Sequence, residues 1–166
     1  RDVAERFNHH MGETFVVPEA RIDEQVMIVP GTDGEKMSKS RDNLVRIFAS
    51  EKELKQDVMG IVTDSQPLEA PKDPEANNVY RLFKLVAPAD AVTTMAEKFR
   101  AGGYGYGHAK KELLAVLLDG FRTERDTFQR LMNEPGELDR ELRMGADKAR
   151  SVASAVLQRV RERLGY

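Results

Sequence analysis

Hydrophobic positions near the start of the chain change from helical spacing to short continuous runs. Val3, Ala4 and Phe7 recur at the spacing of one face of a helix, which predicts an amphipathic helix over about the first ten residues. Two apolar runs follow, at 15–17 and 26–29, and a proline ends each of them. These runs predict two short, buried strands.

A helix followed by short buried strands is typical of a parallel α/β sheet. Two strands do not form a stable sheet of their own. Residues 1–43 are therefore interpreted as the trailing edge of a larger α/β domain. The first helix also lacks a capping residue or a preceding turn, so the sequence is expected to be part of a longer chain.

Beyond residue 44 the apolar positions have helical spacing throughout. Ser50 and Glu53 form the sequence signature of a capping box, and a proline-rich connector occupies residues 63–78. One long helix is predicted over 108–132, and residues 44–166 as a whole are predicted to form an all-α bundle of about five antiparallel helices. The stripes expected to face its core are Leu54, Val58 and Ile61; Val79, Leu82, Phe83 and Val86; Val92, Met95, Ala96 and Phe99; Leu114, Leu117, Leu118, Phe121, Phe128 and Leu131; and Ala149, Val152, Ala153, Val156, Leu157, Val160 and Leu164.

Composition excludes several classes of protein. The 166 residues include no cysteine, so disulfides, thiolate metal sites and cysteine nucleophiles are excluded. No apolar run approaches the roughly 20 residues that span a bilayer, and no secretory leader is visible, so a cytoplasmic protein is expected. Residues 1–97 carry 12 Lys+Arg against 18 Asp+Glu, and residues 98–166 carry 14 against 10. This asymmetry fits either a polyanionic partner for the second half or a solvated helical surface of mixed charge.

The stretch GTDGEKMSKS, residues 31–40, carries the clearest candidate chemistry. Lys36 and Lys39 are long-stemmed point charges suited to phosphate oxygens, and Ser38 and Ser40 add hydroxyl donors. The glycines of this stretch, at 31 and 34, permit backbone movement, which suits a loop that closes on a substrate. The loop follows a predicted strand, and ligands of open α/β sheets bind at the carboxyl ends of strands. The P-loop pattern is absent, so we interpret this stretch as a mobile phosphate-binding loop of another kind.

The letters KMSKS, Lys36 to Ser40, match the second signature of the class I aminoacyl-tRNA synthetases. Seven blocks in order resemble the bacterial tryptophanyl branch of that family: RDVAERFN, GETFVVPEARI, VPGTDGEKMSKSRDN, IVTDS, PKDP, GGYGYGHAKKEL and GADKARSVA. The resemblance runs from Arg1 to the C-terminus. It implies that residues 1–43 are the C-terminal remnant of a Rossmann-like catalytic domain and that residues 44–166 bind the tRNA anticodon.

The resemblance also implies a reaction and its participants. Such enzymes activate tryptophan with ATP, which binds together with Mg²⁺, and transfer the aminoacyl group to tRNA(Trp); no protein-bound metal is implied. Lys36 and Lys39 would stabilise the leaving pyrophosphate as catalytic residues, and Met27 would offer backbone groups to adenine. The implied ATP-binding set is Met27, Lys36, Met37, Ser38, Lys39 and Ser40. The candidate tRNA contacts on the following helices are Arg122, Arg125, Lys110 and Lys111.

Some family features are absent from the sequence. The first signature, H-x-G-H, does not occur, and HMGE at 10–13 lacks its second histidine. A C-terminal fragment is therefore expected, inactive alone and dimeric at full length. Asp42 and Asn43 are expected to cap the helix that follows the loop. Two alternatives stay open: a non-catalytic helical module that binds RNA or protein, and, with less support, the sister tyrosyl enzyme, which shares the loop.

Overall fold

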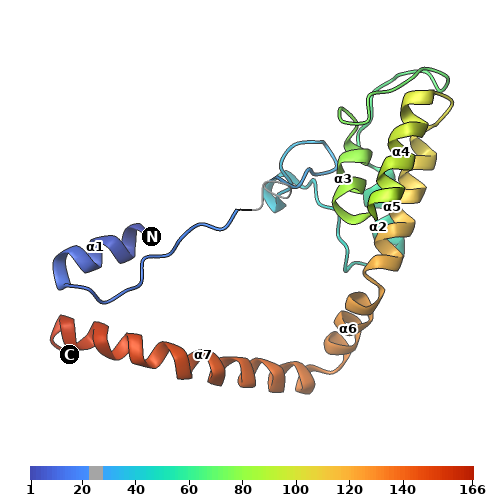
Figure 1. The fold of residues 1–166 in the computed structure, drawn as a ribbon. Coiled ribbons are helices and arrows are strands. Elements are labelled where there is room, and N and C mark those ends of the chain that lie inside the picture. Colours follow the sequence, from blue (N-terminus) through green and yellow to red (C-terminus); the bar gives the residue numbers. More distant parts are fainter. Residues whose placement is uncertain (23–27) are drawn as a thin grey trace. The chain divides into compact units, whose positions relative to one another are not determined.

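The computed structural model describes residues 1–22 and 28–166, and helices dominate it (Figure 1). In chain order the elements are α1 (Asp2–Met11), the short 3₁₀ helix η2 (Lys39–Arg41), α2 (Glu51–Met59), α3 (Asn78–Val86), α4 (Ala89–Ala101), α5 (Tyr106–Gly120), α6 (Arg122–Asn133) and α7 (Pro135–Leu164). The chain divides into two compact units: the described residues of Asp23–Phe128 form one, and Arg1–Ile22 with Gln129–Tyr166 form the other. Of the helices described, none has the length and hydropathy needed to cross a membrane.

The predicted strands are not seen in the described part of the chain. Residues 15–17 do not form a strand, and the side chain of Val16 is 93% exposed. Of the second run, Val26 and Met27 lie outside the described residues, while Ile28 and Val29 do not belong to a strand. A strand is held by a ladder of hydrogen bonds to a neighbouring strand. Among the described residues the end of the second run has only an isolated bridge, between Pro30 and Lys36, and one bond from Met37 to the carbonyl of Val29. The described residues are mostly helical, as predicted for the chain overall, and the α/β trailing edge predicted for residues 1–43 is not visible among them.

The core of the first unit is built by the faces of α2 to α5. Helix α3 packs against α4 and α5, and α2 packs against α5. Nine of the eleven positions in the predicted stripes at 54–61, 79–86 and 92–99 are buried in one cluster, and the other two, Val86 and Val92, are half-buried against it. The cluster consists of Leu54, Val58, Ile61, Val79, Tyr80, Leu82, Phe83, Met95, Ala96, Phe99, Ala109, Leu113 and Leu117. Apolar helical stripes meet in this way because burying them removes apolar area from water.

Local signals fix where these helices begin and end. Ser50 caps α2 through the predicted capping box, in which its hydroxyl accepts from the Glu53 amide. The side chain of Asn77 caps α3 by accepting from the amides of Val79 and Tyr80, which have no partner within the helix. The single helix predicted over 108–132 is wrong, because the chain leaves helical geometry at Phe121 (φ −109°, ψ 18°), directly after Gly120. Glycine is a weak helix former, so the helix divides there into α5 and α6.

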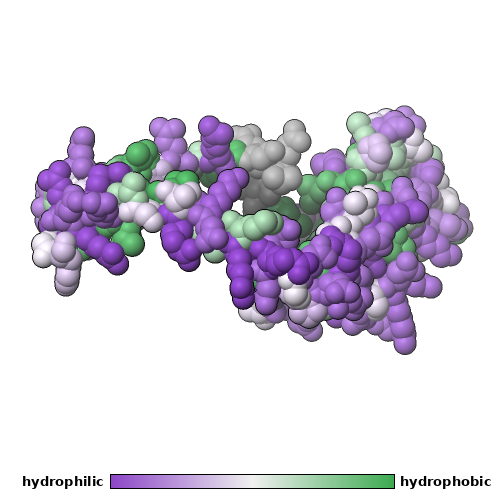
Figure 2. All heavy atoms as spheres, turned by 90° about the horizontal axis from the view of Figure 1, so that it is seen from below, coloured by the Kyte–Doolittle hydropathy of each residue, from purple (hydrophilic) through white to green (hydrophobic). Residues whose placement is uncertain are grey.

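The second unit contains α1 and the 30-residue helix α7. The side chain of Asn8 holds the turn after α1: its oxygen accepts from the amides of Thr14 and Phe15, and its nitrogen donates to the Phe15 carbonyl. No residue of α7 is buried, and Val152 is 72% exposed. Burial of the predicted α7 stripe is therefore not observed. In the left-hand part of Figure 2, hydrophobic side chains of this unit lie open among hydrophilic ones.

Candidate functional site

The candidate loop presents its two lysines to solvent. Lys36, Lys39 and Ser40 are exposed, and no ion pair involves either lysine among the residues that the structure describes. The loop is a tight structure: Pro30 and Lys36 form an antiparallel bridge, and η2 begins at Lys39. The hydroxyl oxygens of Ser38 and Ser40 lie 3.1 Å apart. Two exposed ammonium groups and two hydroxyls on one short loop can receive a polyanion such as a phosphate chain.

Asn43 is the centre of the loop's hydrogen bonds. Its side-chain nitrogen donates to Asp33 Oδ1 at 2.7 Å and to the carbonyl of Lys36 at 3.2 Å. Its side-chain oxygen accepts from the amide of Ser38 at 2.8 Å, and its own carbonyl accepts from the amide of Thr32 at 2.9 Å. The residue is only 2% exposed. One buried amide therefore joins the start, the middle and the end of the loop.

Asp33 completes this network as an acceptor. Its carboxylate also accepts from the amide of Glu35 at 3.0 Å. The hydrogen bond from Asn43 holds the pKa of Asp33 below its ordinary value, with a smaller contribution in the same direction from the charge of Arg41. The carboxylate therefore stays ionised at neutral pH and keeps accepting from Asn43.

The two glycines of the loop allow close approach of other groups. A Cβ at position 31 would lie 2.3 Å from the side-chain nitrogen of Asn43 and 2.6 Å from its carbonyl oxygen. Gly34 has φ +84°, and a Cβ there would lie 2.5 Å from the side chain of Asn78. The sequence suggested glycines that permit movement, whereas the structure gives both of them a packing role.

The loop is also tied to the helical core. The guanidinium of Arg81, on α3, donates to the carbonyl of Gly34 at 3.3 Å. The amide of Val62, just beyond α2, donates to the carbonyl of Thr32 at 2.7 Å, and the side chain of Asn78 donates to the carbonyl of Val62 at 3.1 Å. These bonds attach the loop backbone to the end of α2 and the start of α3.

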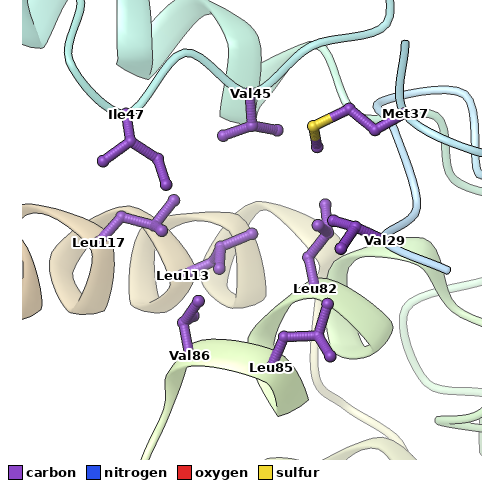
Figure 3. Close-up of a pocket in the computed structure, with 9 residues that line it drawn as sticks. All are labelled: Val29, Met37, Val45, Ile47, Leu82, Leu85, Val86, Leu113 and Leu117. Carbon is purple, nitrogen blue, oxygen red and sulfur yellow. The ribbon is translucent and has the colours of Figure 1, made fainter. Parts of the chain in front are cut away.

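Met37 anchors the loop from beneath. Its amide donates to the carbonyl of Val29 at 2.9 Å, and its side chain lines an apolar cavity of about 200 Å³. Figure 3 shows side chains from the loop region facing side chains of α3 and α5 across this cavity. The lining residues are Val29, Met37, Val45, Ile47, Leu82, Leu85, Val86, Leu113 and Leu117. Met27, predicted to offer backbone groups to adenine, lies outside the described residues.

The four basic residues predicted to contact tRNA have different environments. The ammonium of Lys110 donates to the carbonyl of Met59 at 2.9 Å, and burial lowers its pKa. Arg125 donates to the carbonyl of Ile47. Arg122 pairs with Asp119 at 2.6 Å on an exposed surface, and Lys111 is exposed without a partner in the described structure. Lys111 and Arg122 are therefore the better placed of the four to meet an external polyanion.

Sequence reasoning missed the role of Asn43. The expectation that Asp42 and Asn43 cap the next helix is wrong, because α2 begins at Glu51 and Ser50 is its cap. Asp42 instead ends η2 in the left-handed conformation, with φ 53°. The hydrogen bonds of Asn43 join positions 5 to 11 residues apart, which have no periodic signature in a sequence. The nearest available signal was Gly31, whose lack of a Cβ makes room for this side chain.

Comparisons with known proteins agree on one family. The family model described as tRNA synthetases class I (W and Y) matches residues 1–121. A tryptophan–tRNA ligase from Campylobacter jejuni is 41% identical over 165 residues, and one from Fusobacterium nucleatum is 43% identical over 166. Each alignment covers 99% of this chain and about half of the relative (52% and 51%). The chain therefore spans about half the length of the curated relatives it matches.

A solved structure gives the same result in three dimensions. The tryptophanyl-tRNA synthetase from Campylobacter jejuni, complexed with ADP and tryptophan, matches with a TM-score of 0.83 and 41% identity. The match covers 100% of this chain and 52% of that one. A further structure of the synthetase from the same organism matches with a TM-score of 0.80.

Proposed function

Because the chain belongs to the class I tRNA synthetases of the tryptophan and tyrosine branch, we propose that it serves the ATP-dependent activation of tryptophan and its transfer to tRNA(Trp). The relatives that match almost the whole chain are named tryptophan–tRNA ligases. The structural neighbour is a complex with ADP and tryptophan, which supports a nucleotide and this amino acid as ligands.

The loop would act in the first of two chemical steps. The tryptophan carboxylate attacks the α-phosphorus of ATP, the bond from that phosphorus to the bridging oxygen breaks, and pyrophosphate leaves with the negative charge. In the second step the tRNA 3′ end takes the aminoacyl group and AMP leaves. Catalysis of such a transfer consists mainly of positioning and of stabilising charge as it develops. Lys36 and Lys39 would neutralise the departing pyrophosphate, together with the Mg²⁺ that arrives with ATP.

The remaining residues of the proposed ATP site have supporting roles. The hydroxyls of Ser38 and Ser40 can donate to phosphate oxygens, and Met37 holds the backbone between the two lysines. Met27 is also part of the proposed ATP site, where its backbone groups would contact the adenine ring. The observation that carries the proposal is the presence, on a loop fixed by a buried amide, of two exposed ammonium groups that have no ion-pair partner in the described part of the chain.

The proposal extends to domains, assembly and place of action. Residues 1–43 would belong with the nucleotide-binding catalytic domain, and residues 44–166 would form the helical domain that meets the tRNA anticodon. The complete protein would work as a homodimer in the cytoplasm, where tRNA is charged. A non-catalytic binding module is disfavoured, because it has no use for a loop that presents two free lysines to a pyrophosphate.

Pyrophosphate exchange tests this function directly. The complete gene product is expected to exchange labelled pyrophosphate into ATP when tryptophan is present, and far less when tyrosine replaces it at the same concentration. Tyrosine-dependent exchange would assign the protein to the tyrosyl enzymes instead. Absence of exchange with either amino acid would contradict the enzyme proposal and favour the binding module.

Reversing two basic charges tests the helical domain. In the complete gene product, Lys111→Glu combined with Arg122→Glu is expected to weaken tRNA binding roughly tenfold, since each exposed charge contact contributes up to about 1 kcal/mol. The dependence of the binding constant on salt should also flatten, because fewer counterions are released. Filter binding over a series of salt concentrations measures both quantities.

The matched control for this pair lies on α2. Lys52→Glu with Lys55→Glu makes the same change of net charge at two exposed positions. We expect this control to retain most of the affinity and the original salt slope. If the two double variants behave alike, Lys111 and Arg122 make no specific tRNA contact.

A further inference from the structure

We propose that Asn43 is a positioning residue for adenylate formation, which acts by fixing the backbone from which Lys36 and Lys39 project. This inference rests on the proposed function, since it names a residue that serves the same site. Asn43 itself has no need to touch the substrate: it is 2% exposed and its side-chain bonds are to the loop.

The bonds of Asn43 bracket the lysine-bearing segment. Its nitrogen holds the carbonyl of Lys36, and its oxygen holds the amide of Ser38, so the backbone is fixed on both sides of Met37. Lys39 follows Ser38 directly and begins η2. The stems of both lysines therefore start from backbone whose position this one side chain sets.

An asparagine is the residue that this position requires. The same amide group accepts one hydrogen bond and donates two, to Asp33 and to the carbonyl of Lys36. Aspartate has nearly the same shape but cannot donate, and it would place a second carboxylate against Asp33. There is also little spare room, because a Cβ on Gly31 would already lie 2.3 Å from the Asn43 nitrogen.

The role is confined to the loop. All four hydrogen bonds of Asn43 described above join residues within 32–43. Asn43 is outside the hydrophobic cluster that holds the helices together. Removing its amide should therefore disorder the loop much more than it unfolds the bundle.

A double-mutant cycle in the complete gene product separates positioning from general stability. Asn43→Ala is expected to lower kcat for tryptophan-dependent pyrophosphate exchange by about ten- to hundredfold, because misplacing reacting groups by about 1 Å costs that much. KM for tryptophan should change little. If Asn43 acts through the lysines, adding Asn43→Ala to Lys39→Ala will slow exchange by a smaller factor than Asn43→Ala does alone, because only the part that acts through Lys36 remains. If the loss of kcat in the double variant equals the product of the losses in the two single variants, the proposal is overturned.

Asn43→Asp is the second variant, and it also serves if Asn43→Ala does not fold. It keeps the size and the acceptor and removes the two donor bonds. We expect a loss of kcat comparable to that of the alanine variant. Activity near that of the unmodified protein would mean that Asn43 only fills space, and the proposal would be wrong.

Hydrogen exchange gives a readout that is independent of activity. The amide of Ser38 donates to the side-chain oxygen of Asn43, so it loses its acceptor in Asn43→Ala and should exchange faster. The amide of Thr32 keeps its acceptor, the main-chain carbonyl of residue 43, and should exchange faster only as far as the loop becomes disordered. Asn77→Ala is the matched control: Asn77 is a buried asparagine whose side chain caps α3. Asn77→Ala should lower thermal stability without changing the hydrogen-exchange rates of these two amides. Its effect on the pyrophosphate-exchange rate should be the same whether or not Lys39→Ala is also present.

The outcomes distinguish this inference from the proposed function. If the unmodified protein shows no pyrophosphate exchange, the proposed function fails, and amide exchange alone decides whether Asn43 fixes the loop. If the unmodified protein is active and Asn43→Ala retains full kcat, the proposed function stands and this inference fails.

Discussion

Lys39→Ala in the complete gene product is expected to slow adenylate formation on the order of 10²- to 10³-fold, the usual effect of removing one electrostatic contact from a developing charge. The ammonium of Lys39 is exposed and has no ion-pair partner among the described residues, so its charge is available to a leaving pyrophosphate. Pyrophosphate exchange measures the rate. Tryptophan binding, measured separately by calorimetry, should change far less, because the contact forms with the phosphates.

The control for this experiment is Lys52→Ala. Lys52 is also an exposed lysine, and it lies on α2 away from the loop sequence. We expect the exchange rate of this variant to stay within a factor of about two of the unmodified rate, since exposed single charges contribute little. An unchanged exchange rate in Lys39→Ala would remove the proposed role of the loop.

Phe99→Ala is expected to cost about 3–5 kcal/mol of the free energy of unfolding, the range for truncating a large aromatic side chain in a core. Phe99 is fully buried on α4, and its ring meets the ring of Tyr104 edge-on at a centroid distance of 5.0 Å. Its carbonyl also accepts from the amide of Lys72, which joins the connector to the same helix. Urea unfolding followed by circular dichroism measures the loss.

Phe128→Ala provides the comparison for this variant. Phe128 is 39% exposed, and its described aromatic neighbour is Phe48, at a centroid distance of 5.3 Å. The loss of unfolding free energy should be much smaller than for Phe99, on the order of 1 kcal/mol. Similar losses in the two variants would mean that the cluster around α2 to α5 is not the stabilising core of the unit.

The helices of the core were predictable because burial follows a repeat that the sequence displays. Leu54, Val79 and Phe99 each belong to a stripe that was identified from spacing alone, and each is buried. The cap at Ser50 was predictable for a similar reason, since a capping box is a local pattern.

The predictions that failed depend on partners distant in sequence. An apolar run such as 15–17 becomes a strand only beside another strand. The stripe of α7 has the correct period, but whether it is buried depends on what packs against it. The division of the predicted 108–132 helix has a local cause instead, because Gly120 is a weak helix former that the apolar spacing does not take into account.

The candidate site was predictable in its chemistry and not in its framework. Lys36 and Lys39 stand out in a sequence because their charges and spacing are local. Asn43 gave no such signal, because its role consists of hydrogen bonds to a carbonyl, an amide and a carboxylate that only the folded chain brings together. The same holds for Lys110 and Arg125, whose partners are backbone carbonyls 51 and 78 residues away.

The thioether of Met37 makes the loop sensitive to oxidants. Conversion to the sulfoxide would place a strongly polar group in a cavity whose lining is Val, Ile and Leu, and such a group is costly to bury. The oxidised side chain would leave the cavity and pull on the backbone between the two lysines. Met132 and Met144 are more than half exposed, so their oxidation carries no comparable penalty. Oxidation of Met37 would thus disturb the loop that carries the two lysines, and methionine sulfoxide reductase would be the means of repair.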